Sequence, residues 1–416
     1  MKTLIQVVLL LLLANSITAQ KLTPQQWIED IDYLKEELPK KHKNLYYLKS
    51  PAYFSEQIEK IKLQVPELND FSIAVKLQQV IASMGDTHTS INLSSFFDRS
   101  KDLQLHLFWF KDGLYVLYTT PAYKILLGKR IQKINGFSIS TISDSLSTMI
   151  YPENKALIKK EIPRTLVNTQ LLNYFGFINE APISLEVTNG KETSVVSMKP
   201  EILDRSKRVH VRTKSISAFW KNEKQFFTDY YLPKSKTYVV QYNKCFSREH
   251  PFPNMKNADR LPSFKAFENR VLQTIQQNEV EKLVFDLRLN GGGNSTQGTH
   301  LIQQLAALKN INQKGKLFII LGRWTFSSAI INAMDFKNGT EAIFVGEETS
   351  GRPNHFGEVR NFQLPNSKLI VNFSTKYFRK YDTDAPTLKP DIYAEESFDA
   401  YVNGIDPALE AVLNYK

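Results

Sequence analysis

Two short segments, about 30 residues apart, contain the residue types that acyl-transfer chemistry needs. The first, Leu283–Asn294, reads as a buried strand that runs into the glycines 291–293. The second, Thr325–Ala329, places Ser327 and Ser328 where a strand gives way to a helix. Backbone amides left bare by glycines can stabilise an oxyanion, and a serine beside them can act as a nucleophile once a base takes its proton. The two segments together therefore predict an acyl-transfer site.

Taken alone, each segment has a plainer interpretation. The glycines could form an ordinary tight turn or a phosphate-binding loop, although the G-x-G-x-x-G spacing and a following Gly-Lys-Ser/Thr are both missing. Ser327 could serve only as a helix N-cap. We favour the nucleophile and oxyanion interpretation because the two elements occur together.

Four motifs follow one another in the C-terminal half: Asp286-Leu-Arg-Leu-Asn-Gly-Gly-Gly293, Thr325-Phe-Ser-Ser-Ala329, Val345-Gly-Glu-Glu-Thr-Ser-Gly351 and Lys389-Pro-Asp-Ile392. In order and spacing the chain resembles the C-terminal processing (tail-specific) serine peptidases and the tricorn core protease. The resemblance implies that Ser327 is the nucleophile and that the amides of Gly292 and Ser328 form the oxyanion hole. Residues 103–200, with Leu127–Gly136, resemble the PDZ-like domain of these enzymes.

The base is where the chain departs from the family pattern. The processing branch uses a lysine, but Arg352 stands at the corresponding position, and arginine stays protonated far above neutral pH. Two histidines could replace it: His88, in Gly85-Asp-Thr-His, resembles the base-bearing turn of the tricorn-like branch, and His355 is closer to Ser327 in sequence. The third possibility is that no competent base exists.

Further residues have candidate roles around this site. Glu347 or Glu348 could orient the imidazole, and we take Glu348 as the candidate although the sequence does not choose between them. Arg352 could bind a substrate carboxylate, such as a peptide C-terminus, or form a structural salt bridge. His355 is a second candidate for substrate binding. The seven histidines are scattered without a His-x-x-x-His pair, so we expect neither a metal nor a cofactor.

Composition narrows the class of protein. The chain has 416 residues, of which 42% are hydrophobic and 23% charged, which predicts a globular protein of two or three domains. The net charge of +11 comes from lysines interleaved with acids, without an arginine-rich arm, so we expect no nucleic-acid partner. Cys245 is the single cysteine, which excludes an intrachain disulfide.

The first 19 residues have the features of a signal peptide. Lys2 precedes an apolar run from Leu4 to Ala14, and Ile17-Thr-Ala19 offers a cleavage site before Gln20. No later apolar run approaches the roughly 20 residues of a membrane span. We therefore expect an exported protein, periplasmic or secreted, with no membrane anchor after cleavage.

The hydrophobic pattern predicts an α/β multidomain fold. We expect a helical region over 20–98, a PDZ-like β-rich domain over 99–200 and a serine peptidase core over 201–416. Strands near 238–245, 282–288, 316–322 and 342–347 alternate with helices, which is typical of βαβ-type units in a largely parallel sheet flanked by helices. A hairpin is expected over 358–378, and a last helix over 408–415.

The function that these features predict is that of an exported serine peptidase that cleaves peptide bonds through an acyl-enzyme on Ser327, with a histidine base. Its partner would be a polypeptide substrate, including its C-terminal end, held by the PDZ-like domain. The alternatives are a catalytically weak or inactive peptide- or lipid-binding protein on the same fold, and an esterase or amidase that uses the same serine. The sequence leaves the oligomeric state open.

Overall fold

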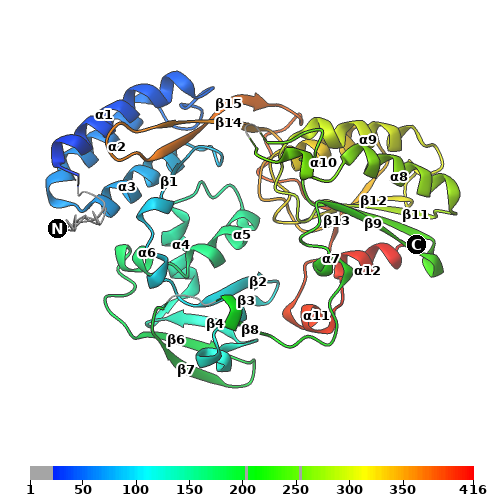
Figure 1. Ribbon diagram of the computed structural model, residues 1–416, viewed down its shortest axis with the longest axis horizontal. Helices are drawn as coiled ribbons and strands as arrows, with labels where there is room; N and C mark the ends of the chain where they lie inside the picture. Colours follow the sequence, from blue (N-terminus) through cyan, green and yellow to red (C-terminus); the bar gives the residue numbers. More distant parts are fainter. Residues whose placement is uncertain (1–21, 202–204, 253–254) are drawn as a thin grey trace, which may run out of the picture.

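The computed structural model describes residues 22–201, 205–252 and 255–416, so the predicted signal peptide lies outside the described residues. Within them the chain is an α/β protein with three sheets, as the sequence predicts at this level. Figure 1 shows the N-terminal helices and a β-rich middle part on one side and a large sheet covered by helices on the other. In this part of the chain, no helix is long and apolar enough to cross a membrane.

The N-terminal region consists of three helices and a short strand. They are α1 (Pro24–Lys41), α2 (Pro51–Gln64), α3 (Asp70–Ser83) and β1 (Ser90–Asn92). Each helix begins at a polar side chain that accepts a hydrogen bond from the first turn: Thr23, Ser50 and Asn69. Helix α3 packs into the N-terminal core with eight buried residues and ends just before Gly85, where the chain turns toward His88.

The middle part is built on an antiparallel sheet of order β2-β3-β4-β6-β7, with β5 and β8 at its side. Its strands are β2 (Leu105–Phe110), β3 (Gly113–Thr119), β4 (Arg130–Ile134), β5 (Phe137–Ser138), β6 (Ile183–Thr188), β7 (Thr193–Met198) and β8 (Val209–His210). The accompanying helices are α4 (Ile139–Ser147), α5 (Lys155–Thr165) and α6 (Thr169–Tyr174). β2 is an edge strand of this sheet, and α5 packs against it.

The C-terminal core is a six-stranded sheet of order β16-β13-β12-β11-β10-β9. Its strands are β9 (Phe227–Leu232), β10 (Thr237–Tyr242), β11 (Lys282–Asp286), β12 (Leu317–Leu321), β13 (Ile343–Gly346) and β16 (Ile392–Tyr393). All neighbouring pairs are parallel except β9 with β10. The helices of this part are α7 (Ala218–Lys221), α8 (Phe264–Gln277), α9 (Ser295–Ala307), α10 (Ser328–Gly339), α11 (Phe398–Asn403) and α12 (Pro407–Leu413).

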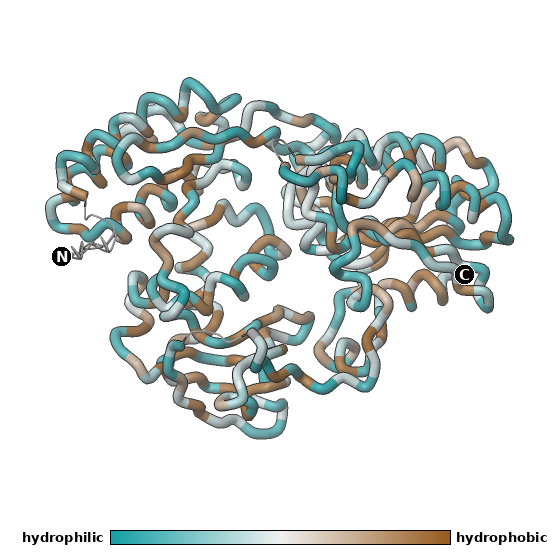
Figure 2. Tube along the Cα trace, viewed as in Figure 1, coloured by the Kyte–Doolittle hydropathy of each residue, from teal (hydrophilic) through white to brown (hydrophobic). Residues whose placement is uncertain are grey.

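Both faces of this sheet are buried, which explains why its strands are almost uniformly apolar. Val240, Phe285 and Ile319 face one side, where they join a core that includes residues of α8, α9 and α10. Val239 and Phe318 face the other side and pack with residues of α12. Figure 2 shows the hydrophobic stretches concentrated along these strands. The carboxyl ends of β11 and β12 lead directly into the glycines and into Ser327, so the rigid sheet positions the candidate site.

A long hairpin, β14 (His355–Gln363) and β15 (Ile370–Phe378), connects the two sides of the molecule. Figure 1 shows it running from the C-terminal core to the N-terminal helices. There β15 pairs antiparallel with β1, and the backbone amides of Asn366 and Ser367, in the turn, each donate to buried Asp30 of α1 at 2.7 Å. The hairpin was expected from the sequence, and its packing brings the turn that contains His88 close to the C-terminal core.

Candidate active site

Ser327 lies on a strained turn between β12 and α10. Its backbone has φ 54° and ψ −125°, a combination that non-glycine residues rarely adopt. Two hydrogen bonds hold the turn (residues 322–327) to the segment that follows β11. Thr325 Oγ1 donates to the carbonyl of Leu287 at 2.9 Å, and the amide of Phe326 donates to the carbonyl of Asn290 at 3.1 Å. Backbone strain of about 1–3 kcal/mol persists where the surrounding structure enforces it, and such strain is concentrated at functional sites.

The glycine loop (residues 290–293) packs directly against this turn. Gly292 has φ +101°, and a Cβ atom built on it would lie 2.8 Å from Ser327 Cβ and 3.0 Å from the nitrogen of Ser328. No residue with a side chain fits at this position without displacing the serine turn. The structure therefore brings together the three residues that were predicted as nucleophile and oxyanion hole.

The two predicted oxyanion donors are in different states. Ser328 is the first residue of α10, so its amide has no acceptor within the helix and remains available. The amide of Gly292 donates to Asn290 Oδ1 at 3.0 Å. Fully buried Asn290 also accepts from Cys245 Sγ at 3.3 Å and donates to the carbonyl of Tyr242 at 2.9 Å. Asn290 therefore fixes the glycine loop, and its contact with Gly292 must be released before both amides can bind an oxyanion.

His88 reaches the same place from the N-terminal region. Its ring stacks on Phe326, the residue before Ser327, with centroids 4.6 Å apart, and on His355 at 5.7 Å. Both ring nitrogens are buried, and neither forms a hydrogen bond, including to Ser327 Oγ. His88 is thus beside the candidate nucleophile, and a proton transfer between the two would require a small rearrangement that brings Nε2 and Oγ into contact.

The carboxylate next to His88 is Asp86. One of its oxygens lies 3.8 Å from His88 Nδ1, and its other oxygen is held by His42 Nε2 at 3.0 Å and by Ser374 Oγ at 2.6 Å. Thr89 Oγ1 donates to the same oxygen at 2.6 Å. Because Ser374 is in β15, the hairpin takes part in holding the acid that faces the candidate base.

The surroundings shift the pKa values of both members of this pair. Burial lowers the pKa of His88 to about 4; His355 and Lys160 act in the same direction, and Asp86 opposes them. Burial raises the pKa of Asp86, but the hydrogen bond from His42 and the proximity of His88 outweigh it and hold the pKa at about 2. At neutral pH the imidazole is therefore neutral and able to accept a proton, and Asp86 is an anion that would stabilise the resulting imidazolium.

The structure places the other predicted site residues differently. Glu348 accepts from the hydroxyl of Tyr393 at 3.1 Å, and Glu347 pairs with Arg323 at 2.8 Å, so the carboxylate that faces the imidazole is Asp86 and not the predicted Glu348. The reason is that Glu347 and Glu348 follow β13, whereas the imidazole arrives from the N-terminal region beside its own acid.

Arg352 and His355 are on the segment whose His355 ring stacks on His88. Arg352 Nη1 lies 3.6 Å from Asp384, and Arg352 Nε is buried without a hydrogen-bond partner, so both predicted roles of this residue remain predictions. His355 donates from Nδ1 to the carbonyl of Arg352 at 3.0 Å, and its Nε2 is buried without a partner. Glu153 is buried nearby, and this burial raises its pKa to about 8. Among the residues that the structure describes, no cluster of histidine, cysteine and acidic side chains has the arrangement of a metal site.

Sequence reasoning missed Asp86, Asn290, Phe326 and Lys160. The Asp-x-His spacing of Asp86 and His88 was the available signal, because residues two apart in a tight turn can face one another. Lys160 gave no signal: it comes from α5, and its ammonium lies 4.5 Å from the ring centroid of Phe326. Burial lowers the pKa of this lysine.

Comparison with known proteins identifies the fold. No protein-family model and no curated protein sequence matches the chain. Among solved structures, mature CPAF complexed with lactacystin matches with a TM-score of 0.63 and 12% identity, over 94% of this chain and 99% of that chain. Mature CPAF alone gives a TM-score of 0.62 and 14% identity, over 94% and 98% of the two chains. The chain has the CPAF fold.

Matches with lower scores include the photosystem II D1 C-terminal processing protease, with a TM-score of 0.39 and 14% identity over 94% of this chain and 96% of that chain. The tricorn protease gives 0.43 and 15% identity over 94% of this chain and 36% of that chain. The fold assignment rests on the CPAF matches, whose TM-scores exceed 0.6. At these identities the fold does not establish the chemistry, which has to be argued from the residues of this site.

Proposed function

We propose that the protein is an exported serine peptidase that cleaves polypeptides through an acyl-enzyme on Ser327. The observation that carries the proposal is the strained Ser327 turn, packed on Gly292 and beside the His88 ring, which stacks on the adjacent Phe326. The CPAF fold supports it, since CPAF has been solved with lactacystin and also as a serine-to-alanine mutant.

In the proposed reaction Ser327 Oγ attacks the carbonyl carbon of the substrate while His88 accepts the hydroxyl proton. Asp86 stabilises the imidazolium. The amides of Ser328 and Gly292 bind the oxyanion, once Gly292 is released from Asn290. His88 then returns the proton to the leaving amine, and water, activated by the same imidazole, hydrolyses the ester on Ser327.

The middle sheet with α4 would be the PDZ-like domain, and the polypeptide, including its C-terminal end, would bind there by strand addition. Export rests on the predicted signal peptide. If cleavage occurs as predicted, the mature protein recovered from the expressing cell should begin at Gln20, which intact-mass measurement can decide.

A fluorophosphonate probe tests the nucleophile, because it phosphonylates activated serines. We expect labelling of the full chain, loss of labelling in Ser327→Ala, and unchanged labelling in the control Ser55→Ala on α2. Lactacystin, which mature CPAF binds, should compete with the probe. Equal labelling of both variants would remove Ser327 from the mechanism.

The alternative is a peptide- or lipid-binding protein on the same fold. It is favoured by the contact between Gly292 and Asn290 and by the missing hydrogen bond between His88 and Ser327. A binding protein needs no base, so His88→Ala would leave ligand binding intact and the full chain would cleave no peptide in a library. An esterase or amidase would label with the probe yet leave peptides uncut.

A further inference from the structure

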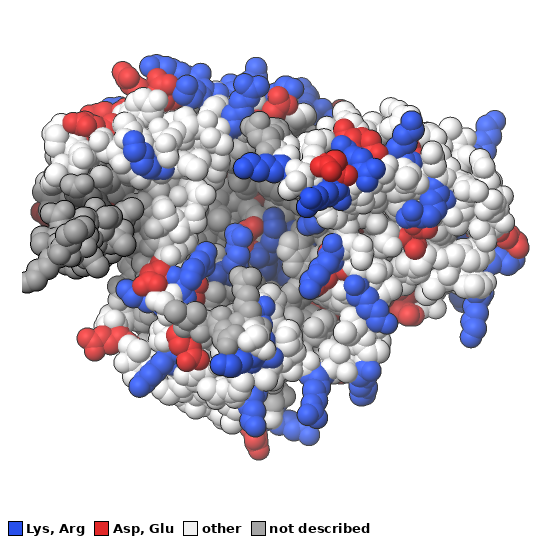
Figure 3. Space-filling view, viewed as in Figure 1, with Lys and Arg blue, Asp and Glu red and all other residues white. Residues whose placement is uncertain are grey.

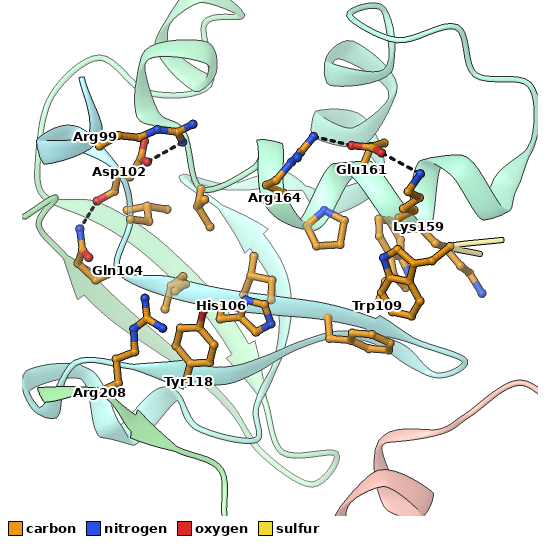
Figure 4. Close-up of a pocket in the computed structure, with 18 of the residues that line it drawn as sticks. Arg99, Asp102, Gln104, His106, Trp109, Tyr118, Lys159, Glu161, Arg164 and Arg208 are labelled. Carbon is orange, nitrogen blue, oxygen red and sulfur yellow. Dashed lines mark hydrogen bonds and ion pairs between the residues drawn. The ribbon is translucent and has the colours of Figure 1, made fainter. Parts of the chain in front are cut away.

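A groove of about 1100 Å³ runs between β2 and α5 and reaches the turn that contains Ser327. We call it the β2–α5 groove. Figure 4 shows Arg208 and Tyr118 at one end and Trp109 with Lys159 at the other. Because β2 is an edge strand, this side of the sheet carries no further strand in the described part of the chain. An elongated groove beside an edge strand suits an extended chain.

Positive charge dominates the lining of the β2–α5 groove. The cations are Arg99, Lys159, Lys160, Arg164 and Arg208, and the acids are Asp98, Asp102 and Glu161. Figure 3 shows Lys and Arg side chains gathered around the hollow at the centre of the visible face. Most of these cations are already compensated: Arg99 pairs with Asp102 at 3.1 Å, Arg164 with Glu161 at 2.8 Å, and Lys159 with Glu395.

Arg208 is the exception. Its guanidinium lies 4.7 Å from the ring centroid of Tyr118, its Nε is buried without a partner, and no carboxylate of the described residues is within ion-pair distance. Figure 4 shows the side chain directed along the groove with no dashed line to any neighbour. A buried guanidinium nitrogen without a hydrogen bond is costly, and an anionic ligand would supply the missing acceptor.

The surroundings of Arg208 favour an anion attached to an extended chain. His106 stacks on Tyr118 at 4.2 Å and 3°, so aromatic rings form the wall next to the cation. Burial, reinforced by Arg208 and His210, lowers the pKa of His106 to about 4. At neutral pH this histidine adds no charge, and the attraction for an anion at this end comes from Arg208.

The opposite end of the β2–α5 groove meets the candidate active site. Trp324, three residues before Ser327, lines it, and Lys160 joins it to Phe326 through the cation–ring contact. The six residues of β2 span about 20 Å at roughly 3.3 Å per residue. A polypeptide bound along β2 with its scissile bond at Ser327 would therefore place a residue about five or six positions away beside Arg208.

We propose that the β2–α5 groove binds an extended polypeptide and that Arg208 selects an acidic side chain about five residues from the bond that is cut. The distance to the cleaved bond rests on the proposed function; the binding preference does not. The protein would then act preferentially on polypeptides with an acidic residue at that distance, which is a narrower substrate class than the fold implies.

Binding is measured on the full chain carrying Ser327→Ala, so that cleavage plays no part. The probes are fluorescein-labelled, carboxyl-amidated peptides of about 12 Ala, Ser and Leu residues with one central Glu or, in the matched set, one central Gln. Fluorescence anisotropy should give about tenfold or more tighter binding of the Glu peptide, the size expected for a charge-assisted hydrogen bond. Added Arg208→Gln should abolish the preference and Arg208→Lys should retain part of it. The control Arg212→Gln, at an exposed arginine outside the groove, should leave it unchanged.

Several results would overturn the proposal. They are equal binding of the two amidated peptides, no saturable binding of either at millimolar concentration, or a Glu preference that survives Arg208→Gln. Binding of a Gln peptide only when its C-terminal carboxylate is free would assign Arg208 to chain ends instead. No fluorophosphonate labelling of the full chain with Ser327 in place, together with an intact Glu preference in the Ser327→Ala protein, would reject the proposed function and leave this inference standing.

Discussion

The nucleophile side and the base side of the candidate site are held in different ways. Ser327, Gly292 and Asn290 come from consecutive strand ends of one parallel sheet, and their contacts are between backbone atoms or fully buried groups. His88 and Asp86 come from the N-terminal region, and Asp86 depends on Ser374, 288 residues away in β15. The nucleophile side is therefore fixed by the core itself. The base side depends on the contacts of the β14–β15 hairpin with the N-terminal region, which we call the seam.

This difference implies that activity can be lost without unfolding of the core. A change that loosens the hairpin would move His88 and Asp86 while the sheet and the serine turn stay intact. His88 stacks on Phe326 without a hydrogen bond to Ser327, and the two residues are held by different regions of the chain. The following variants test the comparison, beginning with the largest expected effect.

If the two sides act as one catalytic unit, their losses should not add. We expect Ser327→Ala and His88→Ala each to lower kcat/KM for a peptide substrate by about 10⁴–10⁶, and the double variant to lose no more than the worse single variant. Steady-state kinetics on the three proteins provide the measurement, with Ser55→Ala as the control. Multiplicative losses would show that His88 acts independently of Ser327.

Asp86→Asn removes the anion from the base side only. We expect a loss in kcat on the order of 10³, because the imidazolium formed during attack would no longer be stabilised, with little change in KM. Ser374→Ala, which removes one hydrogen bond to the same carboxylate across the seam, should cause a smaller loss in the same direction. Full activity in Asp86→Asn would reassign the acid and reopen the case for Glu348.

Gly292→Ala acts on the nucleophile side only. The added Cβ would collide with the serine turn, and φ +101° is strained for alanine, so we expect kcat to fall by about 10²–10³ together with a lower melting temperature. Gly291→Ala is the matched control, since a Cβ there meets nothing within 4 Å. Similar melting temperatures for the two variants would contradict the close contact between Gly292 and Ser327.

The base side should also make stability depend on pH. His88 has a folded pKa of about 4, below its unfolded value near 6.5, so between these pH values its imidazole binds more protons in the unfolded state and the contribution of His88 to stability falls as the pH falls. From pH 7 to pH 5 this amounts to about 2 kcal/mol. Asp86, whose folded pKa is about 2, adds its own loss only below about pH 4.

Urea unfolding at pH 7 and pH 5 measures this effect. His88→Phe, which keeps an aromatic ring in the stack but does not titrate, should show a clearly smaller loss between the two pH values. His355→Phe is the comparison for the neighbouring ring. The same pH dependence in the full chain and in His88→Phe would show that another group is responsible.

The sequence suffices to expect that Ser327, Gly292 and Ser328 lie together, but not that Asp86 faces His88, and the reason is physical. Ser327, Gly292 and Ser328 are adjacent to strand ends, so local strand and turn signals suffice to bring them together. The choice of Asp86 depends on a strand pairing between β1 and β15 and on where a hairpin lands, which hydrophobic periodicity does not encode. Glu348 was a reasonable candidate by motif order, but the pairing of Glu347 and Glu348 with Arg323 and Tyr393 is decided by tertiary packing.

The fold, like the site, has one part that local sequence signals predict and one part that depends on long-range packing. The alternation of strands and helices from residue 237 to 346 follows from near-continuous apolar runs separated by glycines and polar caps, and it was predictable segment by segment. The sequence does not predict where the β14–β15 hairpin packs in the fold. Its exposed strand residues carry no strong apolar pattern, and Asp30 on α1, which anchors its turn, is more than 300 residues away in sequence.

The chemical inertness of Cys245 allows the contact between the hairpin and the C-terminal core to be measured with introduced labels. Its thiol is fully buried, hydrogen-bonded to Asn290, and burial raises its pKa to about 12, so it should be inert toward maleimides at neutral pH. Two cysteines introduced at the surface would then be the only reactive thiols of the chain. One dye on the exposed strand residues of the hairpin and one on α9 would report, by energy transfer in single molecules, how often the base side approaches the nucleophile side.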